Sequence, residues 1–246
     1  MMNIKSPLSI LLFLLICPGF LMSLAFAEKK VLPVDGSYVT GKASAGGIGK
    51  FYMGREISKV MGHLGAGWLE RPERVQQERT DLLIENLKLR PTDKVVDLGA
   101  GSGYFSFRIA PLIPQGKLFA VDISPQMLAI IRAKMKNSKV NNIEPVLSTI
   151  TDLKLEANSA DCILIVDAYH EFSHPMEMGK SIFKTLKSGG RLILIEYRME
   201  DPGIPIKKLH KMSQNQAIKE ISATGLKWVE TSEVLPQQHF MIFRKP

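Results

Sequence analysis

A carboxylate and three alternating glycines follow an apolar, β-branched segment near the middle of this chain. The segment covers residues 94–98, and the pattern at its end is Asp97-x-Gly99-x-Gly101-x-Gly103. Glycines let backbone N–H groups approach a ligand closely, and a helix beginning after them would point its positive end at the same place. This glycine loop therefore predicts a site for an anionic or carboxylate-bearing cofactor of the nucleotide type.

Two other glycine motifs fit the loop less well. A dinucleotide fingerprint, G-x-G-x-x-G, would place its third glycine where Tyr104 stands. The nucleophile elbow of hydrolases, G-x-S-x-G, would need a glycine in place of Ala100, two residues before Ser102. The sequence thus weakens an NAD interpretation and indicates no serine nucleophile.

A second acidic residue ends the next apolar segment. Residues 117–121 have the pattern of a buried strand, and Asp122 stands at its carboxyl end, where open α/β sheets bind their ligands. A carboxylate there can accept hydrogen bonds from both hydroxyls of a ribose. NAD sites use an acid in the same way, so Asp122 alone does not distinguish between cofactors.

The order of these motifs resembles that of the class I S-adenosylmethionine (SAM)-dependent methyltransferases, from about residue 82 to the C-terminus. The resemblance implies SAM as the cofactor, held by Asp97, the glycine loop, Asp122 and Ile123. It also implies that Asp167, at the end of the fourth strand, approaches the methionine amino group. Many members carry an aspartate after the third strand to hold the adenine, but residues 148–152 read Ser-Thr-Ile-Thr-Asp, and we assign no adenine residue.

The remaining segments alternate as expected for a doubly wound α/β domain. Further strands are predicted at residues 143–147, 161–166 and 191–197, and a closing β-hairpin at 226–235 and 240–243. Ser124 and Ser213 are predicted N-caps of the helices that follow them. The resemblance implies a mostly parallel seven-stranded sheet with an antiparallel last strand.

The densest group of titratable side chains follows the predicted fourth strand. His170 is our candidate general base, because an imidazole titrates near neutrality, with Tyr169 and Glu171 as residues that could orient it. The alternative is that His170 caps a helix or binds a backbone carbonyl. We assign these three residues to the catalytic group and assign no metal site.

Residues 170–174 also read His-Glu-Phe-Ser-His, a string that zinc peptidases use. Their mechanism requires both imidazoles on one helical face. Pro175 disfavours helical geometry at His174, so we expect the two imidazoles to point in different directions. Glu196, where a third ligand could stand, lies within a strand pattern. An exported zinc peptidase is kept as the alternative from another class, beside a non-catalytic SAM-binding module.

Three segments precede the predicted SAM-binding domain at residues 81–246. Residues 1–27 combine Lys5, an apolar run and an Ala-x-Ala ending, which is typical of a secretory signal, with an uncleaved membrane anchor as the alternative. Residues 28–50 are rich in glycine and predict a linker. Residues 51–80 predict an N-terminal helical lid over the acceptor pocket.

The predicted lid contains three arginines, Arg55, Arg71 and Arg74, that could bind an acidic acceptor. The alternative is that the segment only packs on the domain through its apolar residues. Neither interpretation identifies the acceptor.

The net charge is +8 in 246 residues, and most of the lysines and arginines are dispersed. The one compact basic group, residues 207–211, favours a solvated face. We therefore expect a small-molecule or lipid-like acceptor and no nucleic acid, with membrane association through the N-terminal segment left open. An exported or membrane-anchored location conflicts with the cytosolic synthesis of SAM, and the oligomeric state is not predicted.

Overall fold

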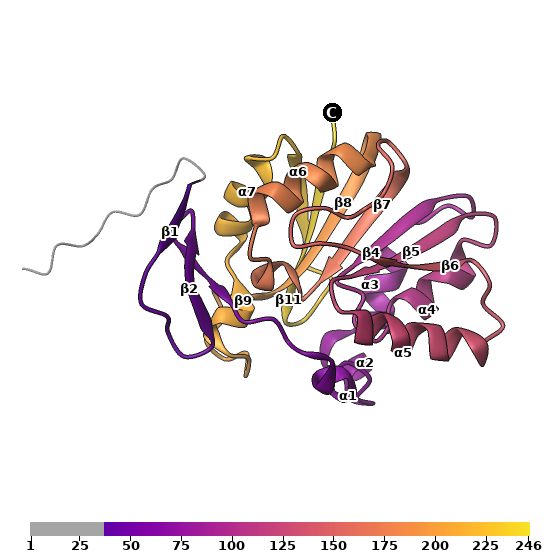
Figure 1. Ribbon diagram of the computed structural model, residues 1–246, viewed down its shortest axis with the longest axis horizontal. Helices are drawn as coiled ribbons and strands as arrows, with labels where there is room; N and C mark the ends of the chain where they lie inside the picture. Colours follow the sequence, from indigo (N-terminus) through magenta and orange to yellow (C-terminus); the bar gives the residue numbers. More distant parts are fainter. Residues whose placement is uncertain (1–36) are drawn as a thin grey trace, which may run out of the picture. The chain divides into compact units, whose positions relative to one another are not determined.

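The computed structural model describes residues 37–246 (Figure 1). The predicted secretory signal at residues 1–27 and the first nine residues of the predicted linker lie outside the described residues. Among the described helices, none is long and apolar enough to cross a bilayer.

The core of the described part is a mostly parallel sheet with the strand order β10-β11-β8-β7-β4-β5-β6. Five strands, β4 to β8, pair in parallel, and β11 lies antiparallel between β8 and β10. A two-residue strand, β9, pairs with the end of β8. The predicted sheet and its reversed last strand are confirmed. The bounds are β4 Lys94–Leu98, β5 Lys117–Asp122, β6 Ile143–Leu147, β7 Ala160–Val166, β8 Leu186–Arg198, β9 Lys211–Met212, β10 Lys227–Ser232 and β11 Gln238–Arg244.

Helices cover both faces of this sheet because successive residues of its strands alternate between two apolar cores. Val95 packs in the core beneath α3, α4 and α5, whereas Val96 packs in the core beneath α6 and α7 (Figure 1). The bounds are α3 Thr80–Asn86, α4 Ser106–Ile109, α5 Pro125–Lys136, α6 Pro175–Thr185 and α7 Gln214–Ser222. Strand order reverses at β4, which pairs with β5 on one side and β7 on the other, and ligands of such sheets bind outside the carboxyl ends at that point.

The predicted N-caps are confirmed. The Ser124 hydroxyl accepts a hydrogen bond from the backbone N–H of Met127, and the Ser213 hydroxyl accepts one from Gln216. The helix after the glycine loop is short: α4 continues as the 3-10 turn η2, Ala110–Leu112, which contains Pro111. Proline has no N–H to extend the α-helical ladder.

The N-terminal region departs from the sequence-based expectation. Three strands, β1 Tyr38–Thr40, β2 Gly47–Tyr52 and β3 Arg55–Ser58, form a separate antiparallel sheet where a linker and then helices were predicted. That prediction is wrong for residues 38–58. Met53 and Gly54, both with positive φ, make the two-residue turn of a β-hairpin.

Helical structure begins only at the 3-10 turn η1, His63–Gly65, and continues through α1 Ala66–Leu69 and α2 Arg74–Glu78 to α3. The predicted helical extension therefore exists, but it starts later than residue 51. Two further 3-10 turns, η3 Tyr169–Glu171 and η4 Lys208–His210, follow β7 and β8 and lead toward the site.

Candidate active site

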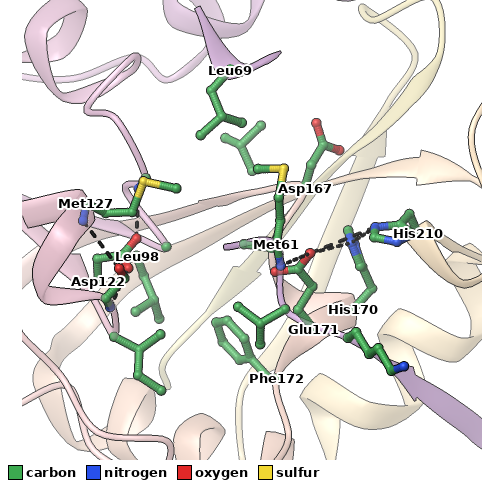
Figure 2. Close-up of a pocket in the computed structure, with 18 of the residues that line it drawn as sticks. Met61, Leu69, Leu98, Asp122, Met127, Asp167, His170, Glu171, Phe172 and His210 are labelled. Carbon is green, nitrogen blue, oxygen red and sulfur yellow. Dashed lines mark hydrogen bonds and ion pairs between the residues drawn. The ribbon is translucent and has the colours of Figure 1, made fainter. Parts of the chain in front are cut away.

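A cavity of about 740 Å³ opens at the carboxyl ends of β4, β5 and β7. Figure 2 shows Asp122 on one side of it and His170, Glu171 and His210 on the other, with Met61 and Asp167 between them. We call the first side the glycine-loop end and the second the histidine end. Ligand sites in proteins commonly measure roughly 300–1,000 Å³, so this cavity has room for a nucleoside-sized cofactor and a small second molecule.

At the glycine-loop end, two of the three glycines face the cavity. Gly99 and Gly101 have φ values of +77° and +54°, and a Cβ on Gly99 would lie 2.7 Å from the Cβ of Ala168. The third, Gly103, does not line the cavity; a Cβ there would lie 3.1 Å from Ile131 and Phe107. The predicted cofactor contact therefore fits Gly99 and Gly101, while Gly103 allows close packing behind the loop.

Asp122 is held in place by the backbone around it. One carboxylate oxygen accepts a hydrogen bond from Gly101 N at 2.8 Å, and the other accepts one from Ser124 N at 2.8 Å. Each oxygen retains a second lone pair for a donor in the cavity. Ile123 also lines the cavity and is partly exposed, so it offers an apolar surface beside the carboxylate.

Asp97 lies beneath the glycine loop and does not line the cavity. Its carboxylate accepts a hydrogen bond from the Ser106 hydroxyl at 2.6 Å. Burial raises the pKa of Asp97 to about 6, helped by the nearby charge of Asp122. Asp97 is therefore not part of the cavity lining, and its predicted share in holding the cofactor stays a prediction.

Asp167 lines the cavity, and one of its carboxylate oxygens is buried and unsatisfied within the described part of the chain. Its backbone has a positive φ of 48°, and Oδ2 accepts a hydrogen bond from the Gln238 amide at 2.7 Å. The other oxygen, Oδ1, is buried and has no hydrogen-bond partner within residues 37–246. Burial and the negative charges of Glu78 and Glu196 raise the pKa of Asp167 well above its usual range. A positively charged hydrogen-bond donor would both pair with the carboxylate and stabilise its negative charge.

The histidine end is organised by a buried carboxylate. Glu196 is fully buried in β8, and its two oxygens accept hydrogen bonds from the backbone N–H and the Nδ1 of His170, the latter at 2.6 Å. The Nε2 atom of His170 then lies 3.1 Å from Nδ1 of His210. Burial alone would lower the pKa of His170, but the charge and hydrogen bond of Glu196 outweigh it and raise the pKa.

Of the three predicted catalytic residues, His170 and Glu171 line this end of the cavity. Tyr169 does not: its ring is fully buried and packs against Phe172. The predicted role of Tyr169 in orienting His170 is therefore corrected, and Glu196 orients the imidazole instead. The sequence does contain a signal for Glu196, because it is a charged residue within a predicted buried strand. Nothing in the basic segment 207–211 marks His210 as a site residue.

The His-Glu-x-x-His string does not assemble a peptidase site. His170 lies in η3, whereas His174 precedes α6 and its Nδ1 lies 2.9 Å from the Ser173 hydroxyl. The His174 ring meets the ring of Tyr38 edge-on. The expectation that the two imidazoles diverge is confirmed.

The arginines of the N-terminal segment all pair with carboxylates of the protein. Arg55 makes two hydrogen bonds to Glu220, at 2.7 and 2.8 Å, and a third to the backbone oxygen of His170. Arg74 pairs with Glu78 at 2.8 Å, and Arg71 pairs with the same carboxylate. Arg71 and Arg74 also line the cavity, so the binding of an acidic acceptor by these arginines stays a prediction. Apolar packing is found at Leu69, which lies over Gly101.

Residues 89–239 match the family model described as a methyltransferase domain. The chain belongs to the SAM-dependent methyltransferases of the class I, Rossmann-like fold. This methyltransferase-family chain is 30% identical over 152 residues to an uncharacterized methyltransferase-like protein of Schizosaccharomyces pombe, which covers 61% of the chain and 56% of that protein. It is 33% identical over 115 residues to demethylmenaquinone methyltransferase of Lactococcus lactis, covering 46% and 45%. The chain thus spans about half the length of these curated relatives.

Among solved structures, a SAM-dependent methyltransferase from Aquifex aeolicus superimposes with a TM-score of 0.70 at 18% identity, over 75% of this chain and 98% of that one. This similarity establishes the shared fold.

The cavity fits SAM, the cofactor of this family. Because Gly99 and Gly101 have no side chains, the space beside the loop stays free for a ligand. Asp122 offers its carboxylate to hydroxyl groups of that ligand. The carboxylate of Asp167, which lines the cavity, suits the methionine ammonium group. The residues present therefore supply an anionic partner for the ammonium, acceptors for hydroxyls and a close backbone approach.

Proposed function

We propose that this protein transfers the methyl group of SAM to a small organic acceptor bound at the histidine end of the cavity. The observation that carries the proposal is the single cavity shared by Asp122 and Asp167 on one side and His170, Glu171 and His210 on the other. A bound SAM supplies an activated methyl group. The chain's own residues then need only position the acceptor, exclude water and remove a proton.

We further propose a partly apolar acceptor with an acidic hydroxyl, amine or carbon. Met61, Phe172 and Ile206 line the cavity together with the polar histidine cluster, so one part of the acceptor meets apolar side chains and another meets imidazoles. The name of the Lactococcus lactis relative, demethylmenaquinone methyltransferase, supports a ring-bearing, lipid-like acceptor. We also keep as proposals that the protein associates with a membrane and that it is exported or membrane-anchored. Both depend on residues 1–27.

His170 is the side chain proposed to act on the acceptor. Its Nδ1 is engaged by Glu196, which leaves Nε2 directed toward His210 and the cavity. An imidazole fixed in this way can take a proton from an acceptor atom that lies against Nε2. Glu171 lies beside it, with Oε1 held by the backbone N–H of Met61 at 3.1 Å.

The test begins with calorimetric titration of the full chain with SAM, with its demethylated product S-adenosylhomocysteine, and with NAD. Binding of the first two without NAD supports the proposal, and absence of SAM binding overturns it. Release of S-adenosylhomocysteine is then measured with phenolic and quinol acceptors. SAM binding with no turnover on any of them would favour the alternative, a non-catalytic SAM-binding module.

A further inference from the structure

We propose that His170, Glu171 and His210 form a binding site for a divalent cation of the zinc type. The three ligand atoms come from η3 and η4, two turns that are 40 residues apart in the sequence and meet at the histidine end. Two imidazole nitrogens and one carboxylate oxygen are a donor set that zinc uses in catalytic sites. The set differs from the His-Glu-x-x-His string, since His210 takes the place of His174.

The spacing of the three atoms fits an ion. Nε2 of His170 lies 3.1 Å from Nδ1 of His210, and Oε1 of Glu171 lies 3.8 Å from each of those nitrogens. The point equidistant from the corners of this triangle lies about 2.1 Å from each atom, which is the length of a zinc bond to nitrogen or oxygen. The spacing therefore lets all three atoms lie within bonding distance of one ion.

The surroundings orient these atoms as ligands. Glu196 accepts the hydrogen of His170 Nδ1, so the lone pair of the neutral imidazole is on Nε2. A carboxylate that binds the far nitrogen of a metal-ligating histidine is the usual second layer of such sites. Glu171 is held independently, because its Oε1 accepts a hydrogen bond from Met61 N.

Charge also favours a cation at this place. The carboxylates of Glu171 and Glu196 both lie close to the His170 imidazole. The positive charge of Lys207 acts on His210. The guanidinium of Arg55, which also reaches this region, is already paired with Glu220. Without a cation, the two imidazoles need one hydrogen between their facing nitrogens, and an ion would take the place of that hydrogen.

The site has an open side. All three residues line the cavity, so a fourth position faces the space where the acceptor is proposed to bind. Catalytic zinc sites keep such a position for water or substrate, and the ion lowers the pKa of a bound hydroxyl. An acceptor hydroxyl bound there would lose its proton to solvent, and His170 would then serve as a ligand in place of a direct proton acceptor. This use rests on the proposed function, but the binding of the cation does not.

The experiment titrates the full chain with Co²⁺ after dialysis against a chelator. Cobalt replaces zinc in such sites and absorbs visible light when four-coordinate, so we expect the band to saturate at one ion per chain and to disappear when Zn²⁺ is added. His210→Ala should abolish the band. Glu196→Gln should weaken Co²⁺ binding by about 10- to 100-fold, because it loosens the orientation of His170.

His174→Ala is the matched control, since it removes the other histidine of the string and should leave the cobalt band unchanged. Absence of a saturable band, or equal loss of the band in His174→Ala and His210→Ala, would overturn the proposal. SAM titration of the same samples separates this outcome from failure of the proposed function, because Asp122 and Asp167 do not contribute to the cation site.

Discussion

The two ends of the cavity are built in different ways. At the glycine-loop end, the turns that end β4 and β5 hold each other through backbone N–H groups, as in the contact of Gly101 N with Asp122. At the histidine end, side chains hold side chains: Glu196 from β8 fixes His170 from η3, and His210 arrives from η4. The first end depends on local backbone geometry, and the second depends on the packing of distant segments.

This difference teaches that the two ends can be changed separately. Backbone donors at the glycine-loop end are set by the strands of the central sheet, which remain when a side chain at the histidine end is replaced. The histidine end depends in addition on the small N-terminal sheet, because Arg55 of β3 donates a hydrogen bond to the backbone oxygen of His170. Substitutions should therefore separate SAM binding from methyl transfer.

The largest expected effect is at His170. His170→Gln keeps an amide donor that can reach Glu196 but removes the imidazole. We expect methyl transfer to fall by about 10²- to 10⁴-fold, the range for loss of a group that handles a proton in the reaction. The dissociation constant for SAM, measured by calorimetry, should change by less than about two-fold because the sites do not share partners. His174→Gln is the control and should retain activity; a parallel loss of SAM binding in His170→Gln would show that the ends are not separable.

A second test removes the ion pair between Arg55 and Glu220, which supports the histidine end from the N-terminal sheet. Arg55→Met leaves Glu220, which is fully buried, without its charged partner. Removal of one member of a buried pair costs about 3–5 kcal/mol, so the urea midpoint should fall clearly. Adding Glu220→Leu should restore most of this stability, since an apolar pair removes the unpaired charge. Asp81→Asn, which removes an exposed pair with Arg79, should leave the midpoint unchanged.

The glycine-loop end could be predicted from the sequence because its information is local. The strand, the turn glycines and the carboxylate at the end of the next strand are adjacent in the chain, and parallel strands bring their carboxyl ends to one edge. The same holds for the N-caps of α5 and α7, which depend on Ser124 and Ser213 alone. Local patterns therefore predicted the strands, the two N-caps and the placement of Asp122 at the carboxyl end of β5.

The histidine end could not be predicted in the same way. The sequence suggested that Tyr169 orients His170, yet the Tyr169 ring is buried in the core. Glu196, 26 residues away in the sequence, binds the imidazole instead. His210 stands in a basic segment whose composition favours solvent. The N-terminal sheet was missed because the glycines of residues 28–50 were interpreted as a linker and residues 51–80 as helical, whereas Gly54 makes a hairpin turn.

A third test concerns the carboxylate beneath the glycine loop. Because burial raises the pKa of Asp97 to about 6 in the folded protein, the folded state holds a proton that the unfolded chain releases near its ordinary pKa of 3.8. Stability should therefore fall as the pH rises from about 4 to 6, by up to about 3 kcal/mol from this group, and change no further above that range.

Asp97→Asn removes this titration. The difference in unfolding free energy between variant and wild type, measured with urea from pH 4 to 8, should shift in favour of the variant up to about pH 6 and then stay level. Effects of other groups, such as Asp167, cancel in the difference. A constant difference across the whole range would mean that Asp97 is ionised throughout and that the loop rests on a charged carboxylate.

The smallest expected effect is on SAM affinity at the glycine-loop end, when Asp122 is replaced. Asp122→Asn keeps the size of the side chain, but its amide nitrogen can no longer accept a hydrogen bond from Gly101 or Ser124, and the negative charge offered to hydroxyl donors is lost. We expect SAM affinity to fall by about ten-fold, consistent with the strength of hydrogen bonds to a charged acceptor. Asp152→Asn, which changes an acid outside the cavity, should leave the affinity unaltered. Unchanged SAM affinity in Asp122→Asn would mean that the backbone of the glycine loop, and not the carboxylate, holds the cofactor, and the local character of this end would then be stronger still.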